Sequence, residues 1–391
     1  MTSIPKIPVD LYNYTLPEDR IANFPASPRD HSKLLLFQNN KISDHHFYNL
    51  PEFIPAHTTV VVNNTKVIPA RLWFLNDKGQ KIQIFILKPI AIDWTVCEVL
   101  VGNRKKFKPE DILVLEVEGL FLKVYWQNRD LNLIKFETNA PSILDAIEVL
   151  GQVPLPPYIL RDVESSDKNN YQAIFAEKEG AVAAPTASLH FTDELKLSLE
   201  KANIKFDEVT LHVSAGTFKP VTAEFANEHE MHAERFEVSV DFLNRLLDGN
   251  SGVVAIGTTS MRVLESLYFL GEKLHLGILD DCFVASTDAY DTRFGNISTR
   301  EALLCLRDFA MNNGGYVKGE TQIFIVPGFE FRIVQWIITN FHQPKSTLLM
   351  LISAFIGDAW KVIYGHAMSN DYRFLSYGDG SLLHGSKNIS F

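Results

Sequence analysis

The sequence predicts an α/β protein: a mixed, largely parallel sheet domain with helices on its faces, and an inserted small antiparallel β-barrel domain. In the second half of the chain strands alternate with helices, which is typical of a largely parallel sheet. Between Arg71 and Thr138 the pattern changes to five short apolar runs without a helical period, which indicates a small antiparallel barrel or sandwich. At 391 residues the chain is also long for one compact core.

The first predicted elements are a buried strand and the inserted strands that follow it. Residues 58–64, TTVVVNN, read as a buried strand that ends in an Asn turn. The inserted strands are KIQIFIL, WTVCEVLV, DILVLEV, LFLKVYW and LNLIKFE. A helix then begins after Ser142, whose hydroxyl can cap it together with Asp145, and ends at Gly151. The segment VPLPPYI (153–159) follows as an extended connector.

The α/β pattern continues after this connector. Thr192 is the expected N-cap of the helix in HFTDELKLSLEKAN. The next expected elements are a strand (KFDEVTLHV), a helix (VDFLNRLLDG), a strand (SGVVAIG) and a helix (TSMRVLESLYFL). The apolar runs WIIT (336–339) and LLMLISAFIG (348–357) predict a strand and a helix, capped by Ser346 or Thr347. Residues 1–70 and 151–391 are therefore expected to form the α/β domain, and residues 71–150 the barrel domain.

Composition limits the class of protein. Hydrophobic residues make up 46% and charged residues 21%, which is ordinary for a globular chain with a substantial core. The three cysteines include no CxxC pair, which argues against a disulfide framework, a zinc knuckle or an iron-sulfur cluster and favours a cytoplasmic protein. The start MTSIPKIPVD has no apolar signal core, and the longest apolar run, Leu348 to Ile356, is far shorter than the ~18 residues of a membrane span. No membrane partner is expected.

The net charge of −10 does not suggest a nucleic-acid partner for the chain as a whole. A local patch is the remaining possibility, and the densest is the run Asn103-Arg104-Lys105-Lys106-Phe107-Lys108. Taken alone, such a run is more often the solvated tip of a hairpin than a binding site.

Four strand ends in the α/β half continue into turns rich in small and hydrogen-bonding residues. These turns are AAPTASLHFT (183–192), LHVSAGTFKP (211–220), IGTTSMR (256–262) and TNFHQPKST (339–347). In an open parallel sheet, ligands bind beyond the carboxyl ends of the strands, so we expect these turns to outline one pocket. No GxGxxG or GxxxxGK[ST] motif occurs, so a standard phosphate loop is not available.

The turn IGTTSMR has the clearest chemical interpretation. Gly257 allows a sharp backbone turn, Thr258 to Ser260 supply hydroxyls and amides at a helix start, and Arg262 adds a cation one turn later. Such a helix start favours a carboxylate or a phosphate. The alternative is that these residues only cap the helix.

The segment EHEMHAE (228–234) places His229 and His232 close to Glu228 and Glu234. A zinc site would need a third ligand and the helical spacing of HExxH, so we expect no metal here. Histidines with acid-base or hydrogen-bonding roles, or simply structural ones, are the favoured interpretations.

Taken in order, the motifs of the chain resemble those of one known family. The motifs are YTLP (14–17), NNTKVIPARL, LPPYI, GAVAAPTASLHFT, LHVSAGTFKPV, HEMHAERFEV, GTTSMRVLES, TQIFIVPGFEF, ITNFHQPKSTLLMLISAFIG and YRFLSYGDG. The chain is similar, from Tyr14 to Asp379, to the S-adenosylmethionine:tRNA ribosyltransferase-isomerases of queuosine biosynthesis. The resemblance implies an α/β domain with an inserted barrel.

It also implies the reaction, in which the ribosyl group of S-adenosylmethionine is moved and isomerised onto the 7-aminomethyl-7-deazaguanine (preQ1) base at the tRNA wobble position. The product carries an epoxycyclopentanediol, and adenine and methionine leave. The implied partners are S-adenosylmethionine, consumed as a co-substrate, and the anticodon arm of tRNA. No other cofactor is expected, and the expected oligomeric state is a monomer.

The chemistry requires a base for a C5′ proton, a proton donor for adenine and a site for the methionine carboxylate. The residues that the resemblance places in the site fall into three groups. The candidates for catalysis are His190, His212, His232, His342 and Glu234. The candidates for substrate binding are Thr186, Ser188, Gly216, Thr217, Gly257, Thr258, Thr259, Ser260, Arg262, Asn340, Lys345 and Ser346. The candidates for tRNA binding are Arg71, Arg104, Lys105, Lys106 and Lys108.

The chain departs from the family pattern at several places. Asn64 stands where the family usually has an Asp, the GxGTF turn begins Ser214-Ala215-Gly216, and the barrel run RPGKR is replaced by residues 102–106. A segment at about 270–320 is longer than expected, with STREALLCLRDFAMNNG as an added helix. These departures motivate two alternatives: a diverged member that binds tRNA without turnover, and an enzyme that acts on a different acceptor base.

Overall fold

The structure is a computed structural model that describes residues 3–213, 221–248, 252–279 and 281–385. Its main feature is a ten-stranded mixed sheet. The strand order is β15 (Phe283–Val284), β16 (Tyr316–Thr321), β13 (Glu234–Ser239), β12 (Lys205–Leu211), β3 (Thr59–Asn63), β14 (Val253–Ile256), β17 (Trp336–Asn340), β18 (Gly380–His384), β1 (Lys33–Gln38) and β2 (Lys41–His46).

The centre of this sheet is parallel and completely buried. Strands β12, β3, β14 and β17 run parallel to one another, and every residue of β3, β14 and β17 is buried. Their continuous apolar runs suit strands that are covered on both faces. Strands β13 and β18 pair antiparallel with this centre on its two sides, so the sheet is mixed.

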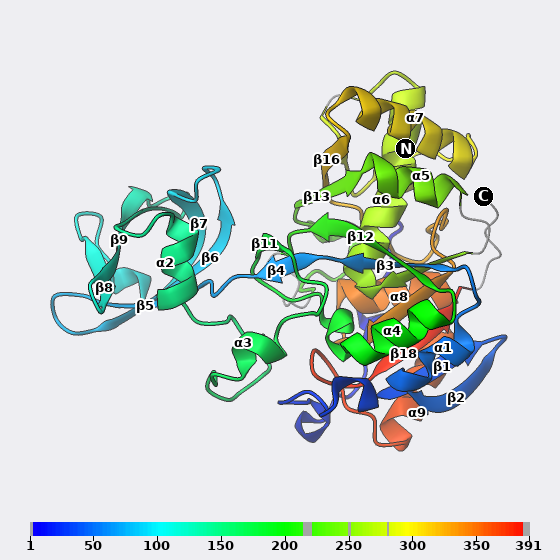
Figure 1. The fold of residues 1–391 in the computed structure, drawn as a ribbon, viewed down its shortest axis with the longest axis horizontal. Coiled ribbons are helices and arrows are strands. Elements are labelled where there is room, and N and C mark those ends of the chain that lie inside the picture. The colour runs from blue at the N-terminus through cyan, green and yellow to red at the C-terminus, as the bar shows by residue number, and fades with distance from the viewer. Residues whose placement is uncertain (1–2, 214–220, 249–251, 280, 386–391) are drawn as a thin grey trace.

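Helices cover both faces of the sheet (Figure 1). They are α1 (Leu50–Phe53), α4 (Asp193–Lys201), α5 (Val240–Asp248), α6 (Gly257–His275), α7 (Thr299–Asn312), α8 (Thr347–Ile356) and α9 (Ala359–Ser369). The short helix α3 (Asp167–Asn170) lies apart from them, near the junction with the smaller sheet. Val61 and Ile337 belong to the core beneath α6 and α8, whereas Val60 and Ile338 belong to the core beneath α1 and α4. This alternation follows from the two-residue period of a strand and gives a three-layer arrangement.

A six-stranded antiparallel sheet lies to one side of the large sheet (Figure 1). Its order is β5 (Arg71–Leu75), β6 (Lys81–Pro89), β7 (Val96–Gly102), β10 (Leu133–Thr138), β9 (Leu120–Asn128) and β8 (Leu113–Val117). Helix α2 (Ile143–Leu150) shares its apolar core through Ile143, Ala146 and Ile147. A two-stranded parallel sheet of β4 (Thr65–Val67) and β11 (Lys178–Ala181) lies near the junction.

The predicted barrel is wrong, because the six-stranded sheet is not closed. Its two edge strands, β5 and β8, are five residues each and form no ladder with one another in the described chain. The main chain at Arg71 instead exchanges hydrogen bonds of 3.1 and 2.8 Å with Gln152, after α2. A connector segment therefore occupies part of the edge that barrel closure would need.

The remaining predicted elements are found close to their expected positions. Ser142, Thr192 and Ser346 cap α2, α4 and α8 by accepting hydrogen bonds of 3.1, 3.1 and 3.2 Å from the amide three residues later. The predicted added helix is α7, which packs on α6 and α5. Strand β5 and the β1–β2 hairpin were not predicted. The division into domains at residues 71 and 150 stays a prediction.

No single described helix is both long and apolar enough to cross a membrane, although α8 and α9, which meet at a bend of 114°, satisfy that test as a pair.

Candidate active site

A cavity lies at the carboxyl ends of β14 and β17, with about 690 Å³ of space between atoms, part of it open to solvent. Three of the four polar turns meet there. Its lining residues are Tyr158, Ala183, Ala184, Pro185, Thr186, Ala187, Val213, Gly257, Thr258, Thr259, Thr339, Asn340, Phe341, His342, Gln343, Ser346, Leu348, Leu375 and Ser376. The fourth turn reaches the cavity with Val213, while the predicted Gly216 and Thr217 lie outside the described residues. We call this space the central cavity.

The wall of the central cavity is polar but uncharged. Within the described part of the chain its lining includes hydroxyl, amide and imidazole groups and no Asp, Glu, Lys or Arg. Two polar atoms in it, Thr259 Oγ1 and Asn340 Oδ1, are buried and have no hydrogen-bond partner among the described residues. Since buried polar atoms are rarely left unpaired, these two are candidates for bonds to a ligand. Such a wall suits a nucleoside, which offers several neutral donors and acceptors.

Asn340 is held in place by His190. Its Nδ2 lies 3.0 Å from His190 Nε2, and His190 Nδ1 lies 3.0 Å from Ser32 Oγ. Burial, with smaller contributions from Arg373 and Arg29, lowers the pKa of His190 to about 3, so the ring is neutral and its Nε2 accepts from the amide. His190 stacks on Phe47 and is absent from the cavity wall. The structure therefore gives it a contact with Asn340 rather than with a ligand.

His342 is the one predicted catalytic histidine that lines the central cavity in the described chain. Its Nε2 lies 2.8 Å from Thr339 Oγ1. Its backbone is held on both sides, because its N–H donates to Tyr364 Oη over 2.9 Å and its carbonyl accepts from Tyr14 Oη. Burial lowers the pKa of His342 to about 3, so the imidazole is uncharged near neutral pH.

The start of α6 forms another side of the central cavity. Gly257 has φ +81°, a conformation that favours glycine, and Thr258 and Thr259 follow it on the wall. Ser260 is buried with its hydroxyl unpartnered, but it is not on the wall. The predicted group of three hydroxyl residues and Arg262 is thus divided, because successive helical residues point in different directions.

Arg262 lines a second, smaller cavity, which we call the side cavity. Its lining residues are Met231, His232, Arg262, Ile323, Phe324, Ile325, Thr347, Leu348 and Leu351. Arg262 forms a buried ion pair with Glu234 through Nη1 and Oε2, and His232 Nε2 lies 3.5 Å from Glu234 Oε1. The structure thus brings together three of the predicted site residues, next to but outside the central cavity.

The other predicted residues lie elsewhere. His212 Nδ1 lies 3.0 Å from Thr65 Oγ1, and burial lowers its pKa. Lys345 forms a 2.8 Å ion pair with Asp10. Ser188 is buried with its hydroxyl unpartnered, and none of these three residues is on the wall of either cavity. Thr186 and Ser346 do line the central cavity.

Four of the five predicted tRNA-binding cations lie in one loop of the small sheet. Arg104, Lys105 and Lys106 form an exposed 3₁₀ turn between β7 and β8, and Lys108 follows it. The guanidinium groups of Arg104 and Arg129 lie 5.6 and 5.9 Å from the ring centre of Trp126. We call residues 104–108 the basic loop. Arg71 is separate from it: its Nη2 donates to Leu155 O over 3.2 Å.

Sequence reasoning missed several residues of the central cavity. Tyr158 and Ser376 form a 2.6 Å hydrogen bond across it, and Thr339 binds His342. Tyr158 and Ser376 lie in the motifs LPPYI and YRFLSYGDG, which carried the signal, although neither residue was selected from them. No group of three or more possible metal ligands occurs in the portion of the chain that the structure describes.

Comparison with known proteins gives a consistent result over nearly the whole chain. Residues 9–383 match a family described as queuosine biosynthesis protein. The relative from Beijerinckia indica, an S-adenosylmethionine:tRNA ribosyltransferase-isomerase, is 37% identical over 397 residues, with 96% of each chain covered. The protein of that name from Legionella pneumophila (strain Paris) is 37% identical, with 96% of this chain and 98% of the relative covered. The crystal structure of an S-adenosylmethionine tRNA ribosyltransferase from Thermotoga maritima is 27% identical, covers 95% of this chain and 99% of that one, and superposes with a TM-score of 0.46.

Proposed function

The chain belongs to the queuosine biosynthesis family of S-adenosylmethionine:tRNA ribosyltransferase-isomerases, and we propose that its central cavity is where that reaction takes place. The enzyme transfers the ribosyl group of S-adenosylmethionine to the preQ1 base at the tRNA wobble position and isomerises it, giving epoxyqueuosine-tRNA, adenine and methionine. This assignment depends on one observation: residues from three family motifs line the same uncharged cavity wall. S-adenosylmethionine is a consumed substrate, and no other cofactor takes part.

The uncharged wall is suited to a cationic nucleoside. S-adenosylmethionine carries a positive sulfonium, which a nearby Lys or Arg would repel. Neutral His342 avoids that repulsion and offers a ring nitrogen to the substrate, while Asn340 Oδ1 is an acceptor for an amine or hydroxyl donor. We assign His342 to proton transfer or hydrogen bonding at the reacting ribose, and Asn340 to orienting the nucleoside.

The tRNA is held in part by the basic loop. Arg104, Lys105, Lys106 and Lys108 provide local positive charge despite the net charge of −10. Phosphate contacts of this kind position an RNA without reading its sequence, and they weaken as salt is added. The protein acts in the cytoplasm as a monomer, without a membrane partner.

The departure at Asn64 does not favour a diverged, inactive member. Asn64 lines neither cavity, and its side chain is bonded to Thr210 and Glu208 at 2.7 and 3.0 Å. A structural role accounts for these contacts without a catalytic one.

The direct test is adenine release. Purified protein is mixed with S-adenosylmethionine and tRNA that carries preQ1, and the same tRNA with guanine serves as the control. Stoichiometric adenine with the first tRNA and none with the second is expected. Absence of adenine with folded protein and correctly modified tRNA would contradict the proposal, and mass analysis of the product nucleoside identifies a different acceptor base.

A further inference from the structure

Arg262 has one edge of its guanidinium in use and one edge unpaired. Nη1 is paired with Glu234, whereas Nε and Nη2 are buried and have no hydrogen-bond partner in the part of the chain that the structure describes. The Arg262 side chain is only 7% exposed, so water does not readily satisfy these two donors. The Nε–H and Nη2–H bonds are parallel on one side of the planar group, which is the geometry that binds both oxygens of a carboxylate.

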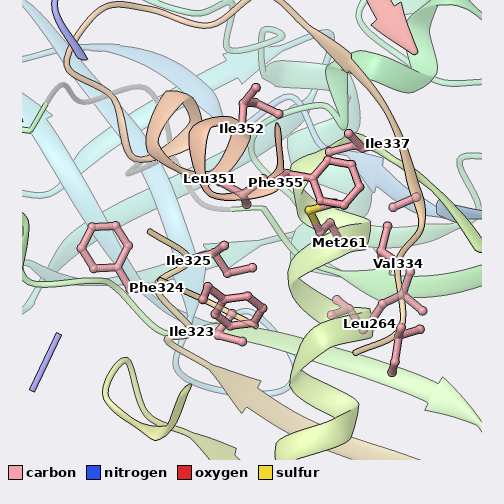
Figure 2. Close-up of a cluster of buried hydrophobic side chains, with 14 of the residues drawn as sticks. Met261, Leu264, Ile323, Phe324, Ile325, Val334, Ile337, Leu351, Ile352 and Phe355 are labelled. Carbon is pink, nitrogen blue, oxygen red and sulfur yellow. The ribbon is translucent and has the colours of Figure 1, made fainter. Parts of the chain in front are cut away.

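The rest of the side cavity is largely apolar. Met231, Ile323, Phe324, Ile325 and Leu351 line it beside Arg262. Figure 2 shows Ile325 next to Leu351 of α8. Such walls suit a short hydrocarbon chain, and the unpaired edge of Arg262 suits an anionic end group.

The two cavities are neighbours at the start of α8. Leu348 lines both of them, Ser346 lines the central cavity and Thr347 lines the side cavity. A ligand that occupied both cavities would pass Leu348. The positive end of the α8 dipole at this point adds to the attraction for a carboxylate.

We propose that the side cavity binds the amino-acid end of S-adenosylmethionine, with the unpaired edge of Arg262 holding its α-carboxylate. This inference rests on the proposed function, because it takes the nucleoside part of the same molecule to lie in the central cavity. The unpaired Nε and Nη2 donors of Arg262 match the two oxygens of one carboxylate, and the apolar lining suits the methylene groups that join this carboxylate to the sulfonium.

The proposal changes the roles expected for these residues. Arg262 becomes a binding residue that anchors methionine while the ribosyl group reacts elsewhere, and Glu234 becomes a positioning residue that pairs with Nη1 of Arg262. His232, 3.5 Å from Glu234, lies at the more exposed side of the pair and contributes to the same polar end.

The test compares two thioether ligands that the enzyme does not consume. S-adenosylhomocysteine has the amino-acid end, and 5′-methylthioadenosine has the same nucleoside and sulfur without it. Titration calorimetry on the full chain measures both dissociation constants. In Arg262→Met we expect S-adenosylhomocysteine to bind about 100-fold more weakly and methylthioadenosine to change less than about twofold. Arg245→Met is the matched control, because Arg245 forms a similar pair with Asp207 but lines neither cavity.

A second variant covers the case in which Arg262→Met does not fold. Arg262→Lys keeps the positive charge beside Glu234 but loses the two parallel donors, and we expect about tenfold weaker binding of S-adenosylhomocysteine with a change of less than about twofold for methylthioadenosine. Equal losses for both ligands, or no loss, in a folded variant would overturn the proposal. Adenine release by the unaltered enzyme tests the proposed function separately, because its outcome does not depend on which residues anchor the amino acid.

Discussion

The central cavity and the basic loop represent two opposite ways of holding a substrate. The cavity is uncharged and built from residues whose positions other buried groups fix, as His190 fixes Asn340. The basic loop is exposed and charged, and its lysines Lys105 and Lys106 have no ion-pair partner among the residues with described positions. The comparison indicates that selectivity for the small molecule comes from fixed dipoles, whereas the RNA is held by charge that salt can screen.

The largest expected effect is at Asn340. Leucine is similar in size to asparagine but has no polar atoms. Asn340→Leu therefore removes the Oδ1 acceptor from the cavity and the Nδ2 donor from His190 Nε2. We expect kcat/KM for S-adenosylmethionine to fall about 100-fold, which is the order of effect of removing one fixed hydrogen-bonding group from an active site. Asn370→Leu is the control, because Asn370 is an exposed residue directly after α9 and lines neither cavity. Unchanged kcat/KM in Asn340→Leu would show that the cavity does not act through this amide.

Acid should lower the free energy of unfolding through two buried histidines, His190 and His342. His190 and His342 have pKa values of about 3 in the folded chain because of burial, against an ordinary value of 6.5. Between these values the unfolded chain binds protons that the folded chain does not, so the free energy of unfolding falls as pH drops below 6.5. The expected slope is about 1.4 kcal/mol per pH unit for each histidine.

Urea unfolding at pH 7.5 and pH 5 measures this dependence. The variants His190→Asn and His342→Asn should each reduce the pH dependence of the free energy of unfolding by the contribution of one histidine. The substitution His57→Asn, at an exposed position, serves as the control. Equal pH dependence in the unaltered chain and in both variants would mean that the two rings titrate normally in the folded protein.

A smaller effect is expected in the basic loop. Lys105→Gln combined with Lys106→Gln should weaken tRNA binding about tenfold at moderate salt and make the salt dependence of log K shallower by about 1.5 to 2. S-adenosylhomocysteine binding should not change. The matched control is Lys201→Gln with Lys205→Gln, which removes the same charge from exposed positions of the large domain. If both pairs weaken tRNA binding equally, the loop has no special part in it.

The sequence predicts this molecule well where a local pattern decides the structure. The apolar runs of β3, β14 and β17 and the caps Ser142 and Thr192 are local signals, and the structure confirms them. Closure of the barrel was predicted wrongly because it depends on which segment pairs with β5, and no local pattern encodes that choice.

The same limit applies to the site. Sequence placed Thr186, Ser188 and His190 in one polar turn, yet only Thr186 faces the central cavity, because side-chain directions within a short helix differ from residue to residue. The pairing of Arg262 with Glu234 joins residues that are 28 positions apart. Motif matching located the region of chemistry, whereas the direction of each side chain required coordinates.

The smallest expected effect concerns Asn64, which contributes to neither substrate region. Its Nδ2 donates to Glu208 over 3.0 Å and its Oδ1 accepts from Thr210 over 2.7 Å. Asn64→Asp keeps the bond from Thr210, but it places a carboxylate opposite the carboxylate of Glu208. The free energy of unfolding should therefore fall by about 1 kcal/mol. Adding Glu208→Gln supplies a donor to the new carboxylate and should restore the loss. Adenine release should be the same in all three proteins when each is measured under conditions in which it is folded. Faster release in Asn64→Asp would instead assign this position a part in the reaction, although Asn64 lines neither cavity.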